Sequence, residues 1–371
     1  MGSAAAYRLA SSGARVLGLD RFHPPHDRGS SHGRTRIIRE AYFEHPAYVP
    51  LVQHAYKLWK ELEAKSGRKL LLPTGGLMIG PEDGVLVAGA KRSAEEHHLQ
   101  HRLLSGDELR REFPVFRIGN KEVAVWEPRA GILFPELCIQ THLDLATKSG
   151  ANLRFGQEVM RWKPEGKGVA VETASGGYTA DHLLISAGAW LNSLAAELRL
   201  PLSIERQVLF WFDPLSVSSS SPVSSSSSNP FAPERFPIFI WESEPHKFFY
   251  GFPDLGDGIK IAIHHQGEVT QADRLNREVS AEETRQAQAV LKKHIPAAAG
   301  NLRSAVVCMY TNTPDEHFIL DFHPAHRQIL IASPCSGHGF KFSAAIGQIA
   351  TELLRGKQPE FDLSLFRIDR F

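Results

Sequence analysis

The chain begins with Met1-Gly2-Ser-Ala-Ala-Ala-Tyr-Arg-Leu-Ala10-Ser-Ser-Gly13-Ala-Arg-Val16-Leu-Gly-Leu-Asp20, a pattern of one helix followed by one strand. Its small apolar residues predict a helix that stops at Gly13, and Arg15 to Leu19 predicts a strand. Asp20 ends that strand, where a dinucleotide-binding βαβ unit has the carboxylate that accepts a hydrogen bond from a ribose hydroxyl. The stretch is therefore predicted to be the second half of such a unit.

Composition narrows the class of protein. The 371 residues are 42% hydrophobic and 22% charged, which is enough to bury a large core in two intertwined domains. The net charge of +1 is spread without a basic tract, so nucleic acid and anionic membranes are not expected as partners. No apolar run approaches the roughly 20 residues that span a bilayer. A small-molecule substrate is the better expectation.

Cysteine usage indicates a reducing compartment. The chain has three cysteines, Cys138, Cys308 and Cys335, an odd number for its length. We therefore expect no disulfide framework and a cytoplasmic location.

The middle of the chain alternates helical and strand patterns. Leu51, Ala55, Leu58 and Leu62 share one face of a predicted helix that ends at Gly67. Aromatic and β-branched runs at 207–212, 236–241, 247–252 and 258–264 have hairpin spacing and predict an antiparallel sheet that covers a substrate. The segments 319–321 and 328–332 are expected to join the nucleotide sheet.

Two blocks near the C-terminus carry the chemistry. The first, Ala305 to Met309, predicts a buried strand with Cys308 at its end, where a ligand can reach the thiol. The second, Ser336-Gly-His338-Gly-Phe-Lys341, opens a helix near Lys341. Gly337 and Gly339 leave backbone N–H groups uncovered there, which suits negative charge such as that on a reduced flavin. A lone cysteine on an apolar strand is otherwise most often a buried structural residue.

These blocks, with the rest of the chain, resemble the monomeric sarcosine oxidase family of amine-oxidising flavoproteins, which includes N-methyltryptophan and pipecolate oxidases. The resemblance spans almost all 371 residues. It implies that Cys308 carries FAD covalently. In the family a hydrophobic strand and a Gly-x-Gly turn precede the position of Gly2, which matches the third glycine of the fingerprint. The chain is thus expected to be truncated at its N-terminus, with a gap beside the strands of Leu19 and Ile185. Pro334 and Cys335 depart from the glycine and aromatic residue that the family more usually has there.

The resemblance also implies the fold class, a mixed α/β (α+β) chain with two domains. A two-dinucleotide-fold, Rossmann-like FAD-binding domain is expected at residues 1–74, 150–204 and 314–371. A substrate domain built on an antiparallel sheet is expected at residues 75–149 and 205–313. Within it, the serine-rich segment 216–229 has too little apolar content to fold and is expected to be a disordered loop.

Five residues are candidates for catalysis. The resemblance places Arg39 and Lys341 above the flavin as a clamp for an amino-acid carboxylate, which needs a two-donor fork and a point charge. It brings Lys260 toward flavin N5, where a cation stabilises superoxide. His264 lies four residues on, along the same strand face, and is expected to shape the pocket. Arg36 is expected to stack near the flavin ring.

Further residues are candidates for cofactor binding. A small-residue turn follows the apolar strand 183–185 and is expected to pass close to FAD. The full cofactor set is Cys308, Gly2, Asp20, His32, Arg36, Val159, Gly188, Trp190, Gly337, His338, Gly339 and Lys341. No metal site is expected, because His97, His98 and His101 lie in a polar helical segment without a Cys or acidic partner at ligand spacing.

The resemblance implies an FAD-dependent oxidase of secondary amino acids, either N-methyl or cyclic, that uses O₂ and releases hydrogen peroxide as a monomer. Two alternatives stay open. One is a glycine or D-amino-acid type oxidase, or a dehydrogenase, of the same fold. The other is a degenerate, cofactor-poor chain, because the phosphate-binding turn is missing from the sequence.

Overall fold

The computed structural model describes residues 1–215 and 229–371. Residues 216–228, which hold most of the predicted serine-rich loop, lie outside the described part of the chain. Asn229 does not fit that prediction, because its side-chain amide donates to Asp254 at 2.9 Å and its carbonyl oxygen accepts from the Phe231 amide at 3.0 Å.

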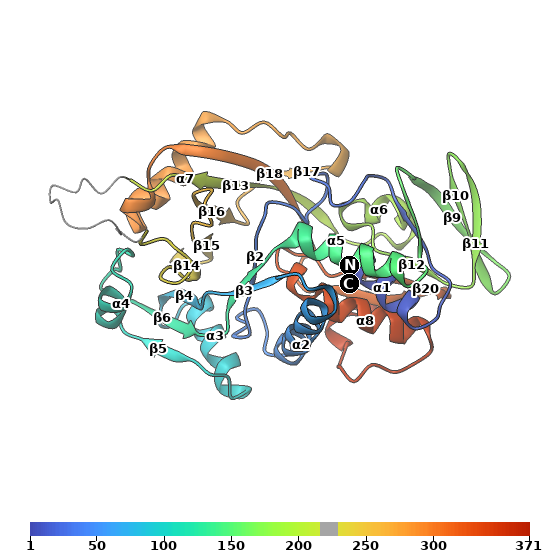
Figure 1. Cartoon of the computed structure of the whole chain (residues 1–371), viewed down its shortest axis with the longest axis horizontal. Helices are drawn as coiled ribbons and strands as arrows, with labels where there is room; N and C mark the ends of the chain where they lie inside the picture. The colour runs from blue at the N-terminus through green and yellow to red at the C-terminus, as the bar shows by residue number, and fades with distance from the viewer. Residues whose placement is uncertain (216–228) are drawn as a thin grey trace.

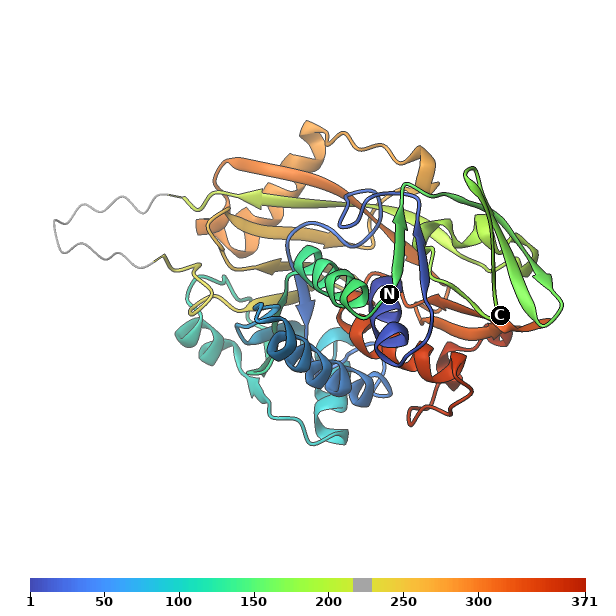
Figure 2. The same ribbon diagram turned by 45° about the vertical axis from the view of Figure 1, so that its right-hand side comes forward.

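The N-terminal segment forms the predicted helix and strand. Helix α1 (Gly2–Ser11) is followed by Gly13 at φ +85 and by β1 (Leu17–Asp20). β1 pairs in parallel with β8 (Asn152–Phe155). Figure 2 shows α1 lying between α5 (Pro135–Lys148) and α8 (Ser343–Leu354). α1 and α8 approach closely, since a Cβ on Gly347 would lie 2.7 Å from the Cβ of Ala4.

The nucleotide-type strands form separate sheets. β12 (Leu183–Ile185) pairs in parallel with β20 (His326–Ser333), which pairs with β19 (Ile319–His323). The expectation that 319–321 and 328–332 join the nucleotide sheet is confirmed for the part that contains β12, whereas β1 and β8 form a separate sheet among the described strands. No described strand pairs with strands of both sheets.

The largest described sheet has nine strands and runs in Figure 1 from β13, β17 and β18 at the top to β4, β6 and β5 at the lower left. Its order is β17-β13-β16-β15-β14-β4-β6-β5, with β18 paired to β13. The prediction of an antiparallel sheet is confirmed except where β14 and β4 pair in parallel. The strands are β4 (Gly76–Pro81), β5 (Arg102–Leu104), β6 (Glu122–Glu127), β13 (Ser203–Phe212), β14 (Ile238–Glu244), β15 (Lys247–Phe252), β16 (Ile259–His264), β17 (Val269–Thr270) and β18 (Leu302–Asn312).

The other elements connect these sheets. The antiparallel sheet β2-β7-β3 lies between the two halves, and the hairpin sheet β11-β10-β9 projects at the right of Figure 1. Their strands are β2 (Arg36–Ile38), β3 (Leu71–Pro73), β7 (Gly131–Leu133), β9 (Val159–Glu165), β10 (Gly168–Thr173) and β11 (Gly176–Ala180). The remaining α-helices are α2 (Tyr48–Ser66), α3 (Val85–Glu96), α4 (Gly106–Glu112), α6 (Leu191–Leu194) and α7 (Ala281–His294).

Local sequence signals explain the helix ends. α2 ends at Gly67, whose φ of +69 is the left-handed conformation that glycine adopts without strain. α4 and α7 begin with complete capping boxes, Ser105 with Glu108 and Ser280 with Glu283. α3 ends at Glu96, so the 97–101 histidines lie beyond the helix in which they were expected.

Two large hydrophobic clusters stabilise the described part of the chain. One buries the inner faces of α1, α2 and α8 and reaches Met78 and Ile240 of the large sheet, and the other surrounds Phe212, Phe239 and Trp241. The division into domains at 75–149 stays a prediction, and α5 within that range packs on α1. No helix in residues 1–215 and 229–371 is long and apolar enough to cross a membrane.

Candidate active site

A cavity of about 1320 Å³ runs from the N-terminal segment to the large sheet. It is larger than the roughly 300–1,000 Å³ of ordinary ligand pockets. Most of the predicted site residues line it, namely Gly2, Asp20, Arg36, Arg39, Val159, Gly188, Trp190, His264, Cys308, Gly337, His338, Gly339 and Lys341. His32 and Lys260 are the two predicted residues that do not line this cavity.

One end of the cavity has the features of a nucleotide site. Asp20 ends β1, and one of its carboxylate oxygens accepts the Phe22 amide at 2.8 Å. Gly188 lies at φ +54 in the turn after β12, and the Trp190 ring packs 5.6 Å from that of Phe22. Gly2 starts α1 so close to β12 that a Cβ on it would lie 2.7 Å from the Ser186 hydroxyl. A larger residue at this position would displace the Ser186 hydroxyl.

Cys308 lies on the wall of the cavity between two polar groups. Its Sγ lies 3.7 Å from the Arg36 guanidinium and 3.7 Å from the Ser30 carbonyl oxygen. The prediction that Cys308 ends its strand is wrong, because β18 continues to Asn312 and Cys308 pairs with Gln207 of β13. Cys308, Ser30 and Arg36 all line the cavity, so the thiol lies at the wall beside the segment 30–36.

Lys260 lies behind that loop. Its ammonium donates to the Gly33 carbonyl at 2.7 Å, the Thr35 carbonyl at 3.0 Å and the Thr35 hydroxyl at 2.9 Å. Burial lowers the pKa of Lys260 well below its ordinary value. Lys260 therefore contacts the cavity wall through Thr35, which does line the cavity.

His32 is buried in the same loop. Burial lowers the pKa of its imidazole to about 4, so the ring is neutral at neutral pH. Its Nε2 atom is buried and has no hydrogen-bond partner in the described part of the chain. A buried polar atom of this kind indicates a missing partner.

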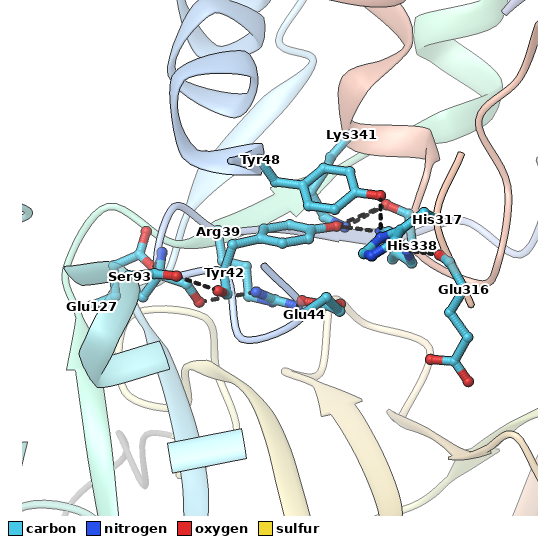
Figure 3. A network of polar contacts seen from close by, with 11 residues as sticks. Arg39, Tyr42, Glu44, Tyr48, Ser93, Glu127, Glu316, His317, His338 and Lys341 are labelled. Carbon is cyan, nitrogen blue, oxygen red and sulfur yellow. Dashed lines mark hydrogen bonds and ion pairs between the residues drawn. The ribbon is translucent and has the colours of Figure 1, made fainter. Parts of the chain in front are cut away.

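Arg39 and Lys341 converge on the ring of Tyr42 (Figure 3). The Arg39 guanidinium carbon lies 4.2 Å and the Lys341 ammonium 5.2 Å from the ring centre. One nitrogen of Arg39 donates to both carboxylate oxygens of Glu44, at 2.7 and 2.6 Å. Burial and the neighbouring Arg39 lower the pKa of Lys341 to about 7. The two residues of the predicted clamp thus lie close together, and Arg39 holds an internal carboxylate.

His338 forms the far side of this group. Its Nε2–H donates to the Glu316 carbonyl at 2.9 Å, so its Nδ1 accepts the Tyr42 hydroxyl at 2.5 Å (Figure 3). The Lys341 ammonium donates to the His338 carbonyl at 2.6 Å and to the Tyr42 hydroxyl at 3.4 Å. Burial lowers the pKa of His338 to about 3. His338 therefore holds Tyr42 and Lys341 in place as a neutral ring.

A second hydrogen-bonded chain faces the cavity from the large sheet. The Tyr310 hydroxyl lies 3.0 Å from Nδ1 of His264 and 3.3 Å from the Tyr250 hydroxyl. Burial lowers the pKa of His264 well below its ordinary value, and it raises the pKa of both tyrosines. These neutral groups give the pocket wall donors and acceptors without adding charge.

Sequence patterns did not identify Glu44, Tyr42 or Glu127. Glu44 binds Arg39, Tyr42 connects Lys341 to His338, and Glu127 accepts two backbone N–H groups next to Arg39. Glu127 belongs to no sequence motif that would have marked it. Glu44 and Tyr42 lie within five residues of Arg39 in the sequence, which is the one available signal.

The fold and the cavity define an FAD-binding oxidoreductase. The family model described as FAD dependent oxidoreductase matches residues 1–353, and the chain belongs to that family. Within it, the chain is 43% identical over 357 residues to a monomeric sarcosine oxidase of Streptomyces avermitilis, covering 95% of this chain and 90% of the relative. It is 36% identical to an N-methyl-L-tryptophan oxidase of Salmonella typhimurium, covering 100% and 96%. The predicted resemblance to the sarcosine oxidase family is confirmed.

Solved structures show the same fold. The open form of NikD, an unusual amino acid oxidase, has a TM-score of 0.81 at 22% identity and covers 98% of this chain and 94% of its own. An L-proline dehydrogenase from P. horikoshii has a TM-score of 0.84 at 22% identity, with 100% and 94% covered. The predicted fold class is confirmed.

The residues of the cavity fit FAD. Gly337 lies at φ +74, and a Cβ there would lie 3.0 Å from His264 and from Tyr310, so the backbone can approach a flat ring. The Asp20 carboxylate provides an acceptor at the far end of the cavity. Among residues 1–215 and 229–371, no group of three or more His, Cys, Asp or Glu side chains lies where it could hold a metal ion.

Proposed function

We propose that the chain oxidises N-methyl amino acids such as sarcosine, with O₂ as electron acceptor. FAD supplies the oxidant that takes a hydride equivalent from the carbon beside the amine nitrogen. Water then hydrolyses the resulting imine. The sum is one N-methyl amino acid, O₂ and water giving the primary amino acid, formaldehyde and hydrogen peroxide.

The contact of Arg39 with Glu44 carries this proposal, because it is a carboxylate held by a buried cation at the cavity wall. A substrate carboxylate takes the place of Glu44 on Arg39 and also meets the ammonium of Lys341. The exchange replaces one buried ion pair with another, so Arg39 is not left unpaired. Both cations rest on the Tyr42 ring, which fixes the orientation of the substrate.

The neutral wall groups favour the reactive form of the amine. His264, Tyr310 and Tyr250 are all uncharged at neutral pH, since burial shifts their pKa values away from the charged forms. An ammonium in this pocket would have no anion among these three groups. The substrate amine therefore binds neutral, with its lone pair available.

Cys308 is proposed as the covalent attachment point of FAD. Its thiol lines the cavity beside the cationic Arg36. A thioether to the flavin ring retains the cofactor and makes it a stronger oxidant. Gly337 and Gly339 bring backbone N–H groups to the same cavity, where negative charge on a reduced ring is stabilised.

Lys260 is proposed to act in the reaction with O₂. Three oxygen acceptors hold its ammonium directly behind Thr35 of the cavity wall and oppose the effect of burial, which lowers its pKa. A fixed cation in a water-poor site stabilises developing superoxide. Relatives described as monomeric support a monomer, and the three free cysteines support a reducing, cytoplasmic location.

The test uses the purified chain with FAD present and a peroxidase-coupled assay for hydrogen peroxide. Sarcosine, N-methyl-L-tryptophan, L-pipecolate and glycine are compared under air. We expect peroxide and formaldehyde with an N-methyl substrate and no turnover with glycine. Turnover with glycine alone, or turnover that requires an artificial electron acceptor in place of O₂, overturns the proposal.

A further inference from the structure

The turn that carries Arg39 is held from the substrate side by a buried carboxylate. Glu127 ends β6, and its side chain is 1% exposed. One oxygen accepts the Glu40 amide at 2.7 Å and the other accepts the Ala41 amide at 2.8 Å. Two consecutive backbone N–H groups are thus fixed by one side chain from a distant part of the sequence.

This contact reaches Arg39 through Ala41. The carbonyl of Ala41 accepts a hydrogen bond from the Arg39 guanidinium at 2.9 Å, while its amide donates to Glu127. The peptide groups of residues 40 and 41 therefore lie between Glu127 and the cation. A shift of this turn moves Arg39, because the guanidinium has a backbone partner on the turn itself.

Helix α3 holds the next residue of the turn. The Ser93 hydroxyl donates to the Tyr42 carbonyl, and both residues are buried. Figure 3 shows Glu127 and Ser93 on one side of the turn and Glu44 on the other. Ser93 therefore fixes the backbone of Tyr42, whose ring contacts Arg39 and Lys341, from the same side on which Glu127 holds residues 40 and 41.

Burial disfavours the charged form of the Glu127 carboxyl, and its hydrogen-bond partners oppose that effect. It raises the pKa of the carboxyl to about 7, although the two backbone N–H groups and Arg39 act in the opposite direction. Glu40, whose own side chain is buried, adds to the rise. A carboxylate kept in such a place for packing alone would be readily replaced by an apolar residue.

We propose that Glu127 is a positioning residue that holds Arg39 in the geometry needed to receive the substrate carboxylate. The inference rests on the proposed role of Arg39 in binding that carboxylate. Glu127 does not touch the substrate. It acts on the affinity for a carboxylate ligand and leaves the chemistry of the flavin unchanged.

The test compares Glu127→Gln with a matched control, Glu242→Gln. Glu242 is also buried, on β14, and also accepts two backbone N–H groups, those of Leu86 and His246. In both variants the NH₂ group of the new glutamine replaces an oxygen that accepted a backbone N–H, so one buried donor loses its acceptor and both variants lose stability. For Glu127→Gln alone we expect KM for the amino acid to rise roughly tenfold, the size of about one hydrogen bond to a charged group.

Further measurements separate positioning from folding. The limiting rate of flavin reduction and the rate of reoxidation by O₂ should change less than about twofold in Glu127→Gln, since neither step uses Arg39 differently once substrate is bound. Calorimetric titration with acetate should show the same loss of affinity without turnover. Glu127→Asp keeps the charge and should recover part of the affinity, and it serves as the test variant where Glu127→Gln does not fold.

Arg39→Met distinguishes the two levels of the proposal. Unchanged acetate affinity in Arg39→Met overturns the proposed function of Arg39 itself. Weakened affinity in Arg39→Met, with equal KM values for the Glu127 and Glu242 variants, overturns the role of Glu127 alone. A selective rise in KM for the Glu127 variant, with the reduction rate retained, supports it.

Discussion

Arg39 donates to both carboxylate oxygens of Glu44 from one nitrogen, at 2.7 and 2.6 Å. Both side chains are largely shielded from water, with exposed fractions of 2% and 11%. Arg39 and its neighbours keep the pKa of Glu44 below its ordinary value although burial alone would raise it. Glu44 is therefore an internal anion that competes with any substrate carboxylate for Arg39.

Removing this competitor should strengthen substrate binding. We expect Glu44→Gln to lower the Kd for acetate by roughly threefold to tenfold, because a neutral amide binds the guanidinium less tightly than a carboxylate. Calorimetric titration measures the effect. Glu316→Gln is the control, since its exposed side chain lies near the same network and its backbone carbonyl is retained. Weaker acetate binding in Glu44→Gln would show that Glu44 assists the clamp.

The ends of helices were predictable from the sequence where a local signal, such as a glycine or a capping box, sets them. Helix α2 ends at the expected Gly67, and the Ser105 and Glu108 pair caps α4 as expected. The split of the nucleotide strands into two sheets and the parallel pairing of β14 with β4 depend on contacts between distant segments. No periodicity along one segment reports such contacts.

The site was predictable to the extent that family motifs marked it. Arg39, Lys341 and Cys308 do line one cavity. The partners of these residues were not predictable, because Glu44 and Glu127 belong to no motif and contact Arg39 or its turn only in the folded chain. Lys260 was expected at the flavin, and the structure places the loop of Thr35 between Lys260 and the cavity.

Cys308→Ala should abolish covalent retention of flavin. We expect all flavin to enter the supernatant after acid precipitation of this variant, whereas the unsubstituted chain keeps it in the pellet. Cys335→Ala is the control, since Cys335 also lines the cavity and no disulfide connects the three cysteines. Flavin that stays with the precipitated Cys308→Ala chain would rule out the attachment.

Lys260→Met should slow the reaction with O₂ more than the reaction with substrate. Loss of a fixed charge that stabilises a developing anion costs on the order of 10²-fold in rate. Stopped-flow absorbance measures flavin reduction and reoxidation separately. Lys247→Met is the control, because that lysine is exposed on β15 and pairs with Glu244. Equal slowing of both half-reactions would mean that Lys260 only anchors the loop of Gly33 and Thr35.

Tyr42→Phe should destabilise the protein by about 1–3 kcal/mol, the cost of a buried acceptor left without its donor. The acceptor is Nδ1 of His338, which receives the Tyr42 hydroxyl at 2.5 Å. Urea unfolding measures the change in free energy. Tyr178→Phe is the control, since its hydroxyl contacts Arg154 in an exposed part of β11. Equal effects of the two substitutions would argue against the buried hydrogen bond.

Lys341 should make carboxylate binding depend on pH near neutrality. Burial lowers the pKa of its ammonium from 10.5 to about 7, so the folded chain loses this charge as the pH rises through 7. We expect the Kd for acetate to rise above pH 7, because Arg39 alone then binds the carboxylate. Acetate is the suitable ligand, since it carries no amine that titrates in the same range.

The same shift has a defined sign for stability. Between pH 7 and 10.5 the unfolded chain binds the proton of Lys341 more tightly than the folded chain, so the contribution of Lys341 to stability rises with pH across that window. In Lys341→Met both the rise in acetate Kd and this stability change should disappear. Lys357→Met, at an exposed lysine beyond α8, should retain both. An unchanged pH profile of acetate binding in Lys341→Met would assign the titration to another group. Glu127, whose pKa is raised to about 7, would then be tested with Glu127→Gln.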